Sequence, residues 1–318
     1  MSKIFVTGAT GYIGRAICSA LVGRGDTVVA LSRNRARAVA ALGAGVQVVQ
    51  GDSCAGGAWQ QAVSGCDAVI NLAGEPIDGK RWDARFRQRL LDSRVDTTRF
   101  LVEAIGAAAA KPVVLASASG VDYYAFDAQT LGVQLEDDDE DDADVFDEGS
   151  PGGDGFLARM CRDWEGEAGR AVEHGLRVVY LRTGIVIDAE SRALRKMSAP
   201  FKLMAGGRVG DGKQWFAWIH RDDAVAAYLF AVDNAALSGP VNLVAGSVRQ
   251  NDFSKALGAA LHRPSWLPVP KFAVKAAVGP LAEYLLNGRH VIPSALRSAG
   301  FTFQHPELSD ALAAIHST

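Results

Sequence analysis

Residues 4–14 read Ile-Phe-Val-Thr-Gly-Ala-Thr-Gly-Tyr-Ile-Gly, and this stretch decides the fold. Ile4 to Val6 predict a short buried strand, and the apolar spacing of Ile13, Ile17 and Leu21 predicts a helix after it. A strand that ends in a glycine-rich turn before a helix presents backbone N–H groups and the positive helix end to a pyrophosphate. The residues that we expect around that pyrophosphate are Gly8, Thr10, Gly11, Tyr12, Ile13 and Gly14.

Each glycine has its own task in such a turn. Gly8 permits the tight turn, Gly11 lets the phosphates come close, and Gly14 lets the helix pack on the strand. The G-x-x-G-x-x-G spacing after a threonine resembles that of the short-chain dehydrogenase/reductase superfamily, and its extended, epimerase-like branch in particular.

The end of the second predicted strand indicates which dinucleotide is bound. Residues 27–31 form this strand, and Ser32 and Arg33 follow it. A dinucleotide fold that prefers NAD usually places an acid there to bind the ribose 2′-hydroxyl. A hydroxyl beside a guanidinium instead suits a 2′-phosphate, which a carboxylate would repel. We therefore predict NADP(H), held by Ser32 and Arg33, with Arg35 and Arg37 as surface cations.

Two further strand ends complete the expected cofactor contacts. Residues 46–49 lead to Asp52, which either accepts a hydrogen bond from an adenine amino group or is a solvated turn aspartate. Residues 67–71 lead to Leu72-Ala73-Gly74, where small residues let the backbone approach the cofactor. The alternation of strands and helices predicts an α/β fold, a Rossmann-like doubly wound parallel sheet with a smaller C-terminal substrate lobe.

The composition is that of an ordinary globular protein, with 318 residues, 48% hydrophobic and 22% charged. A net charge of −3 gives no basic surface for nucleic acid. Residues 136–148 hold ten acids, so 33 basic residues face 26 acids elsewhere, a balance that suits a phosphorylated ligand. Ten like charges repel one another, which predicts a solvated or disordered loop for residues 136–148.

Cysteine usage and hydropathy bear on the compartment. Cys18, Cys54, Cys66 and Cys161 match no metal-ligand spacing. In the absence of a signal peptide they indicate reduced thiols, which predicts a cytoplasmic protein. No apolar run approaches the roughly 18 residues of a membrane span, so we expect no membrane partner. The expected partner is a small-molecule substrate, and a homodimer is left open.

Several motifs in the chain point to one family. They are Glu75-Pro76-Ile77, Lys80-Arg81-Trp82, Ser93-Arg94, Arg182-Thr183-Gly184, Trp218-Ile219-His220, Asp222-Asp223, Gly239-Pro240-Val241-Asn242 and Ile292-Pro293. Together they resemble the atypical extended short-chain dehydrogenase/reductases often labelled sugar-nucleotide epimerase-like, in the NAD-dependent epimerase/dehydratase superfamily. The resemblance implies a Rossmann domain over residues 1–185, joined by part of 215–245, and a C-terminal lobe over residues 186–318.

The same resemblance assigns individual contacts. Ser32 and Arg33 would hold the 2′-phosphate, and Leu72 and Ala73 would lie beneath the cofactor. Val186 would contact the nicotinamide end through its backbone. Arg94 would reach a phosphate or ribose, or it is a surface cation on an arginine-rich helix.

The catalytic residues are less regular. Standard short-chain dehydrogenases place a tyrosine and, four residues later, a lysine on one helix face, where the lysine lowers the phenol pKa. Here Leu157 and Cys161 take those places, and no tyrosine of the chain precedes a lysine at that spacing. The remaining candidates are Ser119, Tyr124 or Tyr123, Glu75 and Lys80, with Ser117 second to Ser119 and with a loop brace as the other interpretation of Glu75. The function is then an NADP(H)-dependent oxidoreductase or epimerase, or else a non-catalytic NADP(H)-binding sensor or scaffold.

A second cluster of chemically able residues is His220 with Asp222 and Asp223. Such a trio suggests a metal site or a charge relay, but acids also favour a helix N-terminus. We interpret it as the start of a helix and predict no metal.

Overall fold

The computed structural model describes residues 1–80, 82–126 and 145–316. A seven-stranded sheet in the order β10-β7-β5-β4-β1-β2-β3 forms its centre, with every neighbouring pair parallel. The strands are β1 (Lys3–Thr7), β2 (Thr27–Ser32), β3 (Val46–Gln50), β4 (Ala68–Asn71), β5 (Val114–Gly120), β7 (Arg177–Thr183) and β10 (Gly239–Leu243). The strand order reverses between β1 and β4, the place where doubly wound sheets bind ligands.

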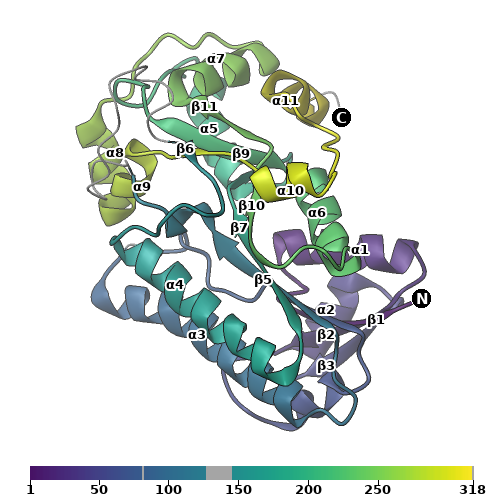
Figure 1. The fold of residues 1–318 in the computed structure, drawn as a ribbon. Helices are drawn as coiled ribbons and strands as arrows, with labels where there is room; N and C mark the ends of the chain where they lie inside the picture. Colours follow the sequence, from purple (N-terminus) through teal and green to yellow (C-terminus); the bar gives the residue numbers. More distant parts are fainter. Residues whose placement is uncertain (81, 127–144, 317–318) are drawn as a thin grey trace.

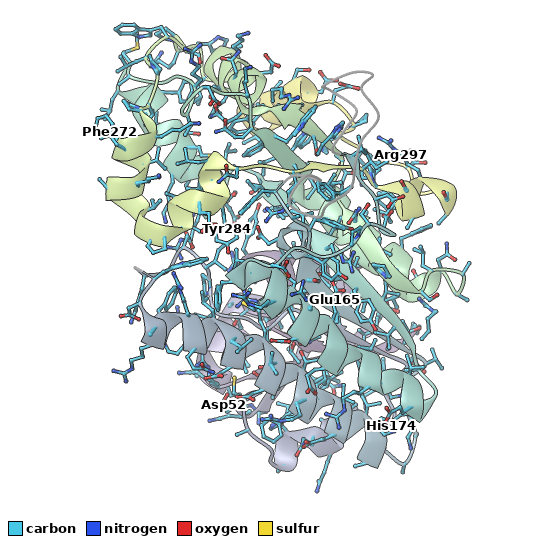
Figure 2. The ribbon with its side chains drawn as sticks, turned by 60° about the vertical axis from the view of Figure 1, so that its left-hand side comes forward. Asp52, Glu165, His174, Phe272, Tyr284 and Arg297 are labelled. Atoms are coloured by element: carbon cyan, nitrogen blue, oxygen red, sulfur yellow. The ribbon has the colours of Figure 1, made fainter. Side chains whose placement is uncertain are left out.

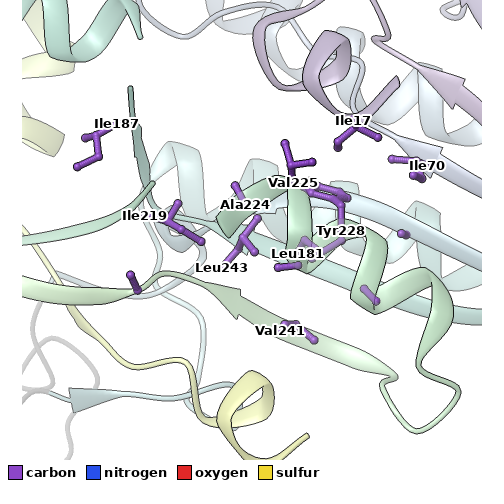
Figure 3. Close-up of a cluster of buried hydrophobic side chains, with 14 of the residues drawn as sticks. Ile17, Ile70, Leu181, Ile187, Ile219, Ala224, Val225, Tyr228, Val241 and Leu243 are labelled. Carbon is purple, nitrogen blue, oxygen red and sulfur yellow. The ribbon is translucent and has the colours of Figure 1, made fainter. Parts of the chain in front are cut away.

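Helices cover both faces of this sheet (Figure 1). One face carries α1 (Tyr12–Gly23), α2 (Arg35–Leu42) and α6 (Arg221–Asp233); the other carries α3 (Ala84–Ala107), α4 (Phe156–Gly169), η1 (Ala58–Val63) and η4 (Arg170–His174). Alternate strand residues supply the two layers, because Ile4 and Val6 face one and Phe5 the other. Figure 3 shows Val225 and Tyr228 of α6 near Ile17 of α1 in the first layer. The predicted Rossmann-like fold is confirmed.

A smaller part of the chain lies beyond one end of the sheet (Figure 1). It holds a three-stranded sheet, β11-β9-β8, and a two-stranded one, β12-β6. The strands are β6 (Val145–Phe146), β8 (Ile185–Ile187), β9 (Trp215–His220), β11 (Gly246–Arg249) and β12 (His290–Val291). The helices are α5 (Arg192–Lys202), α7 (Gln250–Ala260), α8 (Lys271–Val278), α9 (Ala282–Leu286), α10 (Ser294–Ser298) and α11 (Leu308–His316), with short η2 (Val121–Tyr123) and η5 (Gly279–Leu281).

None of the helices in the described ranges is long and apolar enough to cross a membrane. Most of the acidic run, residues 136–144, lies outside the described residues. Its last member, Glu148, is bonded to the large sheet, whereas we expected it to lie in a solvated loop. The Glu148 carboxylate accepts a hydrogen bond from the Asn242 N–H at 2.9 Å, and so it anchors the run to β10.

A buried polar network joins α4, β5, β7 and β10. Arg182 forms a two-point ion pair with Glu165, with nitrogen–oxygen distances of 2.9 and 2.8 Å. Ser119 donates to the same Glu165 carboxylate at 2.6 Å, and the Tyr124 hydroxyl accepts from Arg182 and donates to Asn242. All five side chains are at least nine-tenths buried, and Figure 2 shows Glu165 near the centre of the molecule. Each charge is therefore compensated inside the core.

We expect Glu165→Gln to lower the free energy of unfolding by about 3–5 kcal/mol, because Arg182 would stay buried and charged without its counter-ion. Urea denaturation measures this change. Glu167→Gln on the same helix is the control, since Glu167 pairs with the half-exposed Arg170 and should cost at most about 1 kcal/mol. Equal, small effects of the two substitutions would contradict a compensated ion pair.

Candidate functional site

The turn after β1 forms a cradle whose walls are backbone. Gly8 has a φ of +66°, and a Cβ there would lie 2.7 Å from the carbonyl carbon of Leu72. A Cβ on Gly14 would lie 2.3 Å from the Gly8 oxygen. Gly11 is the N-cap of α1, and no side chain of the described residues caps that helix. The first N–H groups of α1 are therefore left for an anion.

Side chains beneath this cradle hold the ends of β1 and β4 together. The Thr7 hydroxyl donates to Asn71 Oδ1 at 2.6 Å and accepts from the N–H groups of Leu72 and Ala73 at 3.2 and 3.3 Å. Asn71 Nδ2 donates to Thr98 on α3 at 2.9 Å. Sequence reasoning missed the positioning role of Thr7 and Thr98, although the threonine directly before Gly8 was a signal.

Residues that follow β7 in the chain reach the rim of the cradle. The guanidinium of Arg221 lies 5.9 Å from the ring of Tyr12 and pairs with Asp188 at 3.1 Å. Burial, and then the charge of Asp188, raise the pKa of Tyr12. Thr10 is exposed beside the turn, whereas Ile13 packs against the core. Sequence reasoning did not single out Asp188 or Arg221, because their place beside Tyr12 depends on the chain returning from the smaller part.

An open hollow of about 550 Å³ follows the end of β2. Its lining residues are Arg33, Asn34, Arg35, Ala36, Val39 and Gln50. Asn34 fixes the start of α2 by accepting from the Arg37 N–H at 2.9 Å, and Ser32 Oγ accepts from the Asn34 N–H at 3.3 Å. The structure thus brings Arg33 and Arg35 to one opening, directly after Ser32 at the end of β2. Arg35, expected as a surface cation, lines this hollow.

Two expected contacts already have partners within the chain. The Asp52 carboxylate lies at the surface, as Figure 2 shows, and accepts from the Cys54 N–H at 3.1 Å. Asp52 thus braces a surface turn, and its contact with an adenine amino group stays a prediction. The carbonyl oxygen of Val186 accepts from Ser191 Oγ at 2.8 Å. A carbonyl has two lone pairs, so the nicotinamide contact of Val186 stays a prediction.

Arg94 braces the loop after β4 from below. Its Nη1 donates to the backbone oxygens of Glu75 and Leu90 at 3.0 and 3.1 Å, and its guanidinium lies 5.2 Å from the Trp164 ring. A Cβ on Gly74 would lie 3.1 Å from Arg94 Cζ. Burial lowers the pKa of Arg94. The surface-cation interpretation of Arg94 is wrong, and contact with a phosphate or ribose stays a prediction.

Glu75 lies on the same loop with a half-buried side chain. Its N–H donates to Ser93 Oγ at 2.9 Å, which fixes its backbone. Among the residues that the structure describes, no group bonds to the Glu75 carboxylate. The backbone of Glu75 is therefore fixed, while its carboxylate remains available to a ligand.

Ser119 and Tyr124 are placed differently from the expected catalytic pair. Both hydroxyls belong to the buried network around Glu165 and Arg182. The Tyr124 side chain has no exposed surface, and burial raises its pKa to about 12. The Tyr124 hydroxyl already donates its proton to Asn242 and accepts from Arg182. The structure favours a structural role for both residues.

Leu157 and Cys161 occupy one face of α4 and are 1% and 2% exposed. The Cys161 sulfur lies 3.6 Å from where a Cβ on Gly120 would stand, so it faces the end of β5. Burial raises the pKa of the Cys161 thiol to about 12, which makes it neither an acid nor a nucleophile near neutral pH. The helix face that would carry a tyrosine and a lysine is therefore apolar.

Known proteins resemble this chain along nearly its whole length. The Epimerase family protein SDR39U1 homolog, chloroplastic, of Arabidopsis thaliana is 37% identical over 319 residues, covering 98% of this chain and 86% of that protein. Epimerase family protein YfhF of Bacillus subtilis is 35% identical over 311 residues, covering 98% and 96%.

Solved structures agree with this similarity. Human epimerase family protein SDR39U1 (isoform 2), crystallised with NADPH, superposes with a TM-score of 0.82 at 32% identity and 99% coverage of both chains. The nucleoside-diphosphate sugar epimerase from Corynebacterium glutamicum superposes with a TM-score of 0.75 at 28% identity, over 99% of this chain and 58% of that one.

Two family models match separate parts of the sequence. Residues 269–315 match a domain of unknown function, DUF1731, and residues 4–245 match the NAD dependent epimerase/dehydratase family. The second match spans more than half of the chain and includes the cradle, the loop after β4 and the buried network. The chain belongs to the NAD dependent epimerase/dehydratase family.

Proposed function

We propose that this protein is an NADP(H)-dependent oxidoreductase or epimerase of the extended short-chain dehydrogenase type. The observation that carries the proposal is the cradle, in which backbone fills the space that a Cβ on Gly8 or Gly14 would need. Such a cradle, with an uncapped helix N-terminus, fits a dinucleotide diphosphate. The human relative that was crystallised with NADPH supports the same cofactor here.

The preference for NADP(H) over NAD(H) rests on the hollow after β2. Arg33 and Arg35 offer guanidinium groups at this opening, and Ser32, the residue before Arg33, offers a hydroxyl. Guanidinium forms strong, forked hydrogen bonds with phosphate oxygens. The adenosine 2′-phosphate would lie there, and an unphosphorylated ribose would leave these cations without a partner.

When bound, the cofactor supplies or takes up a hydride at a carbonyl or carbinol carbon of the substrate. The chain's own residues bind and orient the reactants. The N–H groups at the start of α1 hold the diphosphate, and Thr7 fixes the loop Leu72-Ala73-Gly74 against which the cofactor lies. Backbone fills the space that a side chain at residue 8 or 14 would need, which explains the glycines at these two positions.

Proton transfer must accompany the hydride, and Glu75 is our candidate for it. Oxidation of a carbinol requires a base for the hydroxyl proton, and reduction of a carbonyl requires an acid. Ser119 and Tyr124 are committed to the buried network, whereas the Glu75 carboxylate has no partner among the described residues. We propose that it exchanges this proton, directly or through one water.

In this proposal the cofactor domain consists of residues 1–185 and part of 215–245, which returns to the large sheet, and the rest of residues 186–318 forms the substrate lobe. A small or sugar-nucleotide-like substrate is proposed, in line with the nucleoside-diphosphate sugar epimerase that this chain resembles.

The free thiols of the four cysteines fit a reducing compartment, and we propose the cytoplasm. A homodimer is proposed as the assembly, for light scattering to test.

A non-catalytic NADP(H) sensor or scaffold is the second candidate. The observation that favours it is the apolar face of α4, where Leu157 and Cys161 replace a proton-transferring pair. Such a protein would bind NADPH in the same cradle without turnover. A survey of carbonyl and sugar-nucleotide substrates, followed at 340 nm, separates the two candidates.

Calorimetric titration of the protein with NADPH and NADH tests the cofactor. We expect NADPH to bind more tightly, and Arg33→Ala to weaken NADPH by about tenfold or more while NADH changes little, because only NADPH carries the 2′-phosphate. Arg89→Ala, on α3 outside the hollow, is the control and should leave both affinities unchanged. Equal affinity of the wild type for both dinucleotides would refute the NADP(H) assignment.

Steady-state kinetics on the best substrate of the survey test Glu75. We expect Glu75→Gln to lower kcat by about 10²-fold or more, because an amide cannot take up the proton, while the NADPH affinity is kept. Glu103→Gln, at an exposed position of α3, is the matched control. An unchanged kcat in Glu75→Gln would remove Glu75 from the mechanism.

A further inference from the structure

Two histidines and an aspartate converge at the start of α6. His220 ends β9 and is the N-cap of α6, Asp222 lies in the first helical turn, and His305 comes from the segment before α11. The rings of His220 and His305 lie with centroids 3.9 Å apart. One ring nitrogen of each histidine and a carboxylate oxygen of Asp222 all lie within 4.8 Å of one another. Three side chains from two distant segments thus point to one position.

A buried carboxylate holds the third member of this group in place. Asp223 has no exposed surface, and its two oxygens accept from the N–H groups of Gln304 and His305 at 2.6 and 2.9 Å. The neighbouring acids therefore have separate tasks. Asp223 turns inward and fixes the backbone of residue 305, while Asp222 keeps a half-exposed carboxylate beside the two rings.

We propose that His220, Asp222 and His305 form a binding site for a divalent transition-metal cation of the Zn²⁺ type. Imidazole nitrogen and carboxylate oxygen are standard zinc ligands, and three protein ligands leave a fourth position for water. In the sequence, His220, Asp222 and Asp223 indicated only the start of a helix. The sequence pattern could not point to His305, because only the fold brings this residue to the site.

The geometry requires only local adjustment. Ligand atoms around a tetrahedral zinc ion stand about 3.4 Å apart when the bonds are ~2.1 Å long. His220 Nδ1 and Asp222 Oδ2 are 3.8 Å apart, and the Asp222 side chain is 49% exposed and able to rotate. His220 Nδ1 accepts from the Asp222 N–H at a long 3.2 Å, a contact that the cation would replace.

The electrostatic surroundings are suited to a cation. The His220 ring is buried, and the carboxylates of Asp222, Asp188 and Asp223 act on it electrostatically. Asp188 and Asp223 add negative charge around the ring. The Arg221 guanidinium pairs with Asp188 at 3.1 Å and more loosely with Asp222 at 3.5 Å, a contact that a bound cation would replace. A bound cation would therefore be compensated by carboxylates on two sides.

Such an ion would link the C-terminal segment to the cofactor half. The segment before α11 would be tied to the start of α6, and α6 packs along α1, whose N-terminus forms the cradle. Zn²⁺ binding at this position requires neither turnover nor bound NADP(H). Its test therefore needs no substrate.

The experiment is titration of chelator-stripped full-length protein with Zn²⁺ against a chromophoric chelator, together with the absorption spectrum of the Co²⁺ form. We expect one Zn²⁺ per chain, a rise in Tm on binding, and Co²⁺ bands of four-coordinate intensity. His305→Gln and Asp222→Asn should each weaken Zn²⁺ by at least about tenfold. Both sites are partly exposed, so these variants keep the fold, as circular dichroism verifies.

His262→Gln is the matched control, because His262 is an exposed histidine on another surface loop. It should leave the Zn²⁺ affinity unchanged. A wild type that binds no Zn²⁺ would overturn the proposal. So would Zn²⁺ binding that survives both His305→Gln and Asp222→Asn, since the ion would then lie elsewhere.

Discussion

The contact between the Gly8 turn and the backbone of Leu72 is the constraint on which the site depends. It brings the ends of β1 and β4 so close that a methyl group at Gly8 would meet the neighbouring chain. The Thr7 hydroxyl then bridges the two strand ends and orients the N–H groups of Leu72 and Ala73. Because β1 and β4 flank the point where the strand order reverses, this single contact shapes the floor of the opening.

The sequence predicts the features that depend only on interactions between residues close together in the chain. The glycine spacing, the strand pattern and the position of Ser32 and Arg33 follow from short-range rules on backbone freedom, alternation and charge. Residues whose partners are distant in the chain could not be placed in this way. Tyr124 looks like an active-site tyrosine in sequence, yet its hydroxyl meets Asn242 and Arg182, which only the folded sheet brings to it.

Arg94 and His305 are two further residues whose contacts the sequence could not predict. Arg94 lies on a helix rich in arginines, and sequence alone cannot show that this one turns inward to the backbone of Glu75. His305 stands in a segment with no recognisable motif, and Asp223 delivers it to His220 through two backbone hydrogen bonds. In both cases one side chain, Arg94 or the buried Asp223, bonds to backbone that is distant in the sequence. The spacing of residues along the chain does not predict such a contact.

The path of the chain through β10 has a consequence for biosynthesis. The polypeptide leaves the large sheet after β7, builds β8, β9 and α6, and only then returns to pair β10 with β7. Arg177 of β7 also donates to the carbonyl oxygens of Ala231 and Val232 in the last turn of α6 and of Leu237 between α6 and β10. A nascent chain that has emerged only as far as β7 therefore presents an open edge strand, a template for aggregation. The ribosome must release the C-terminal part before that edge is sealed.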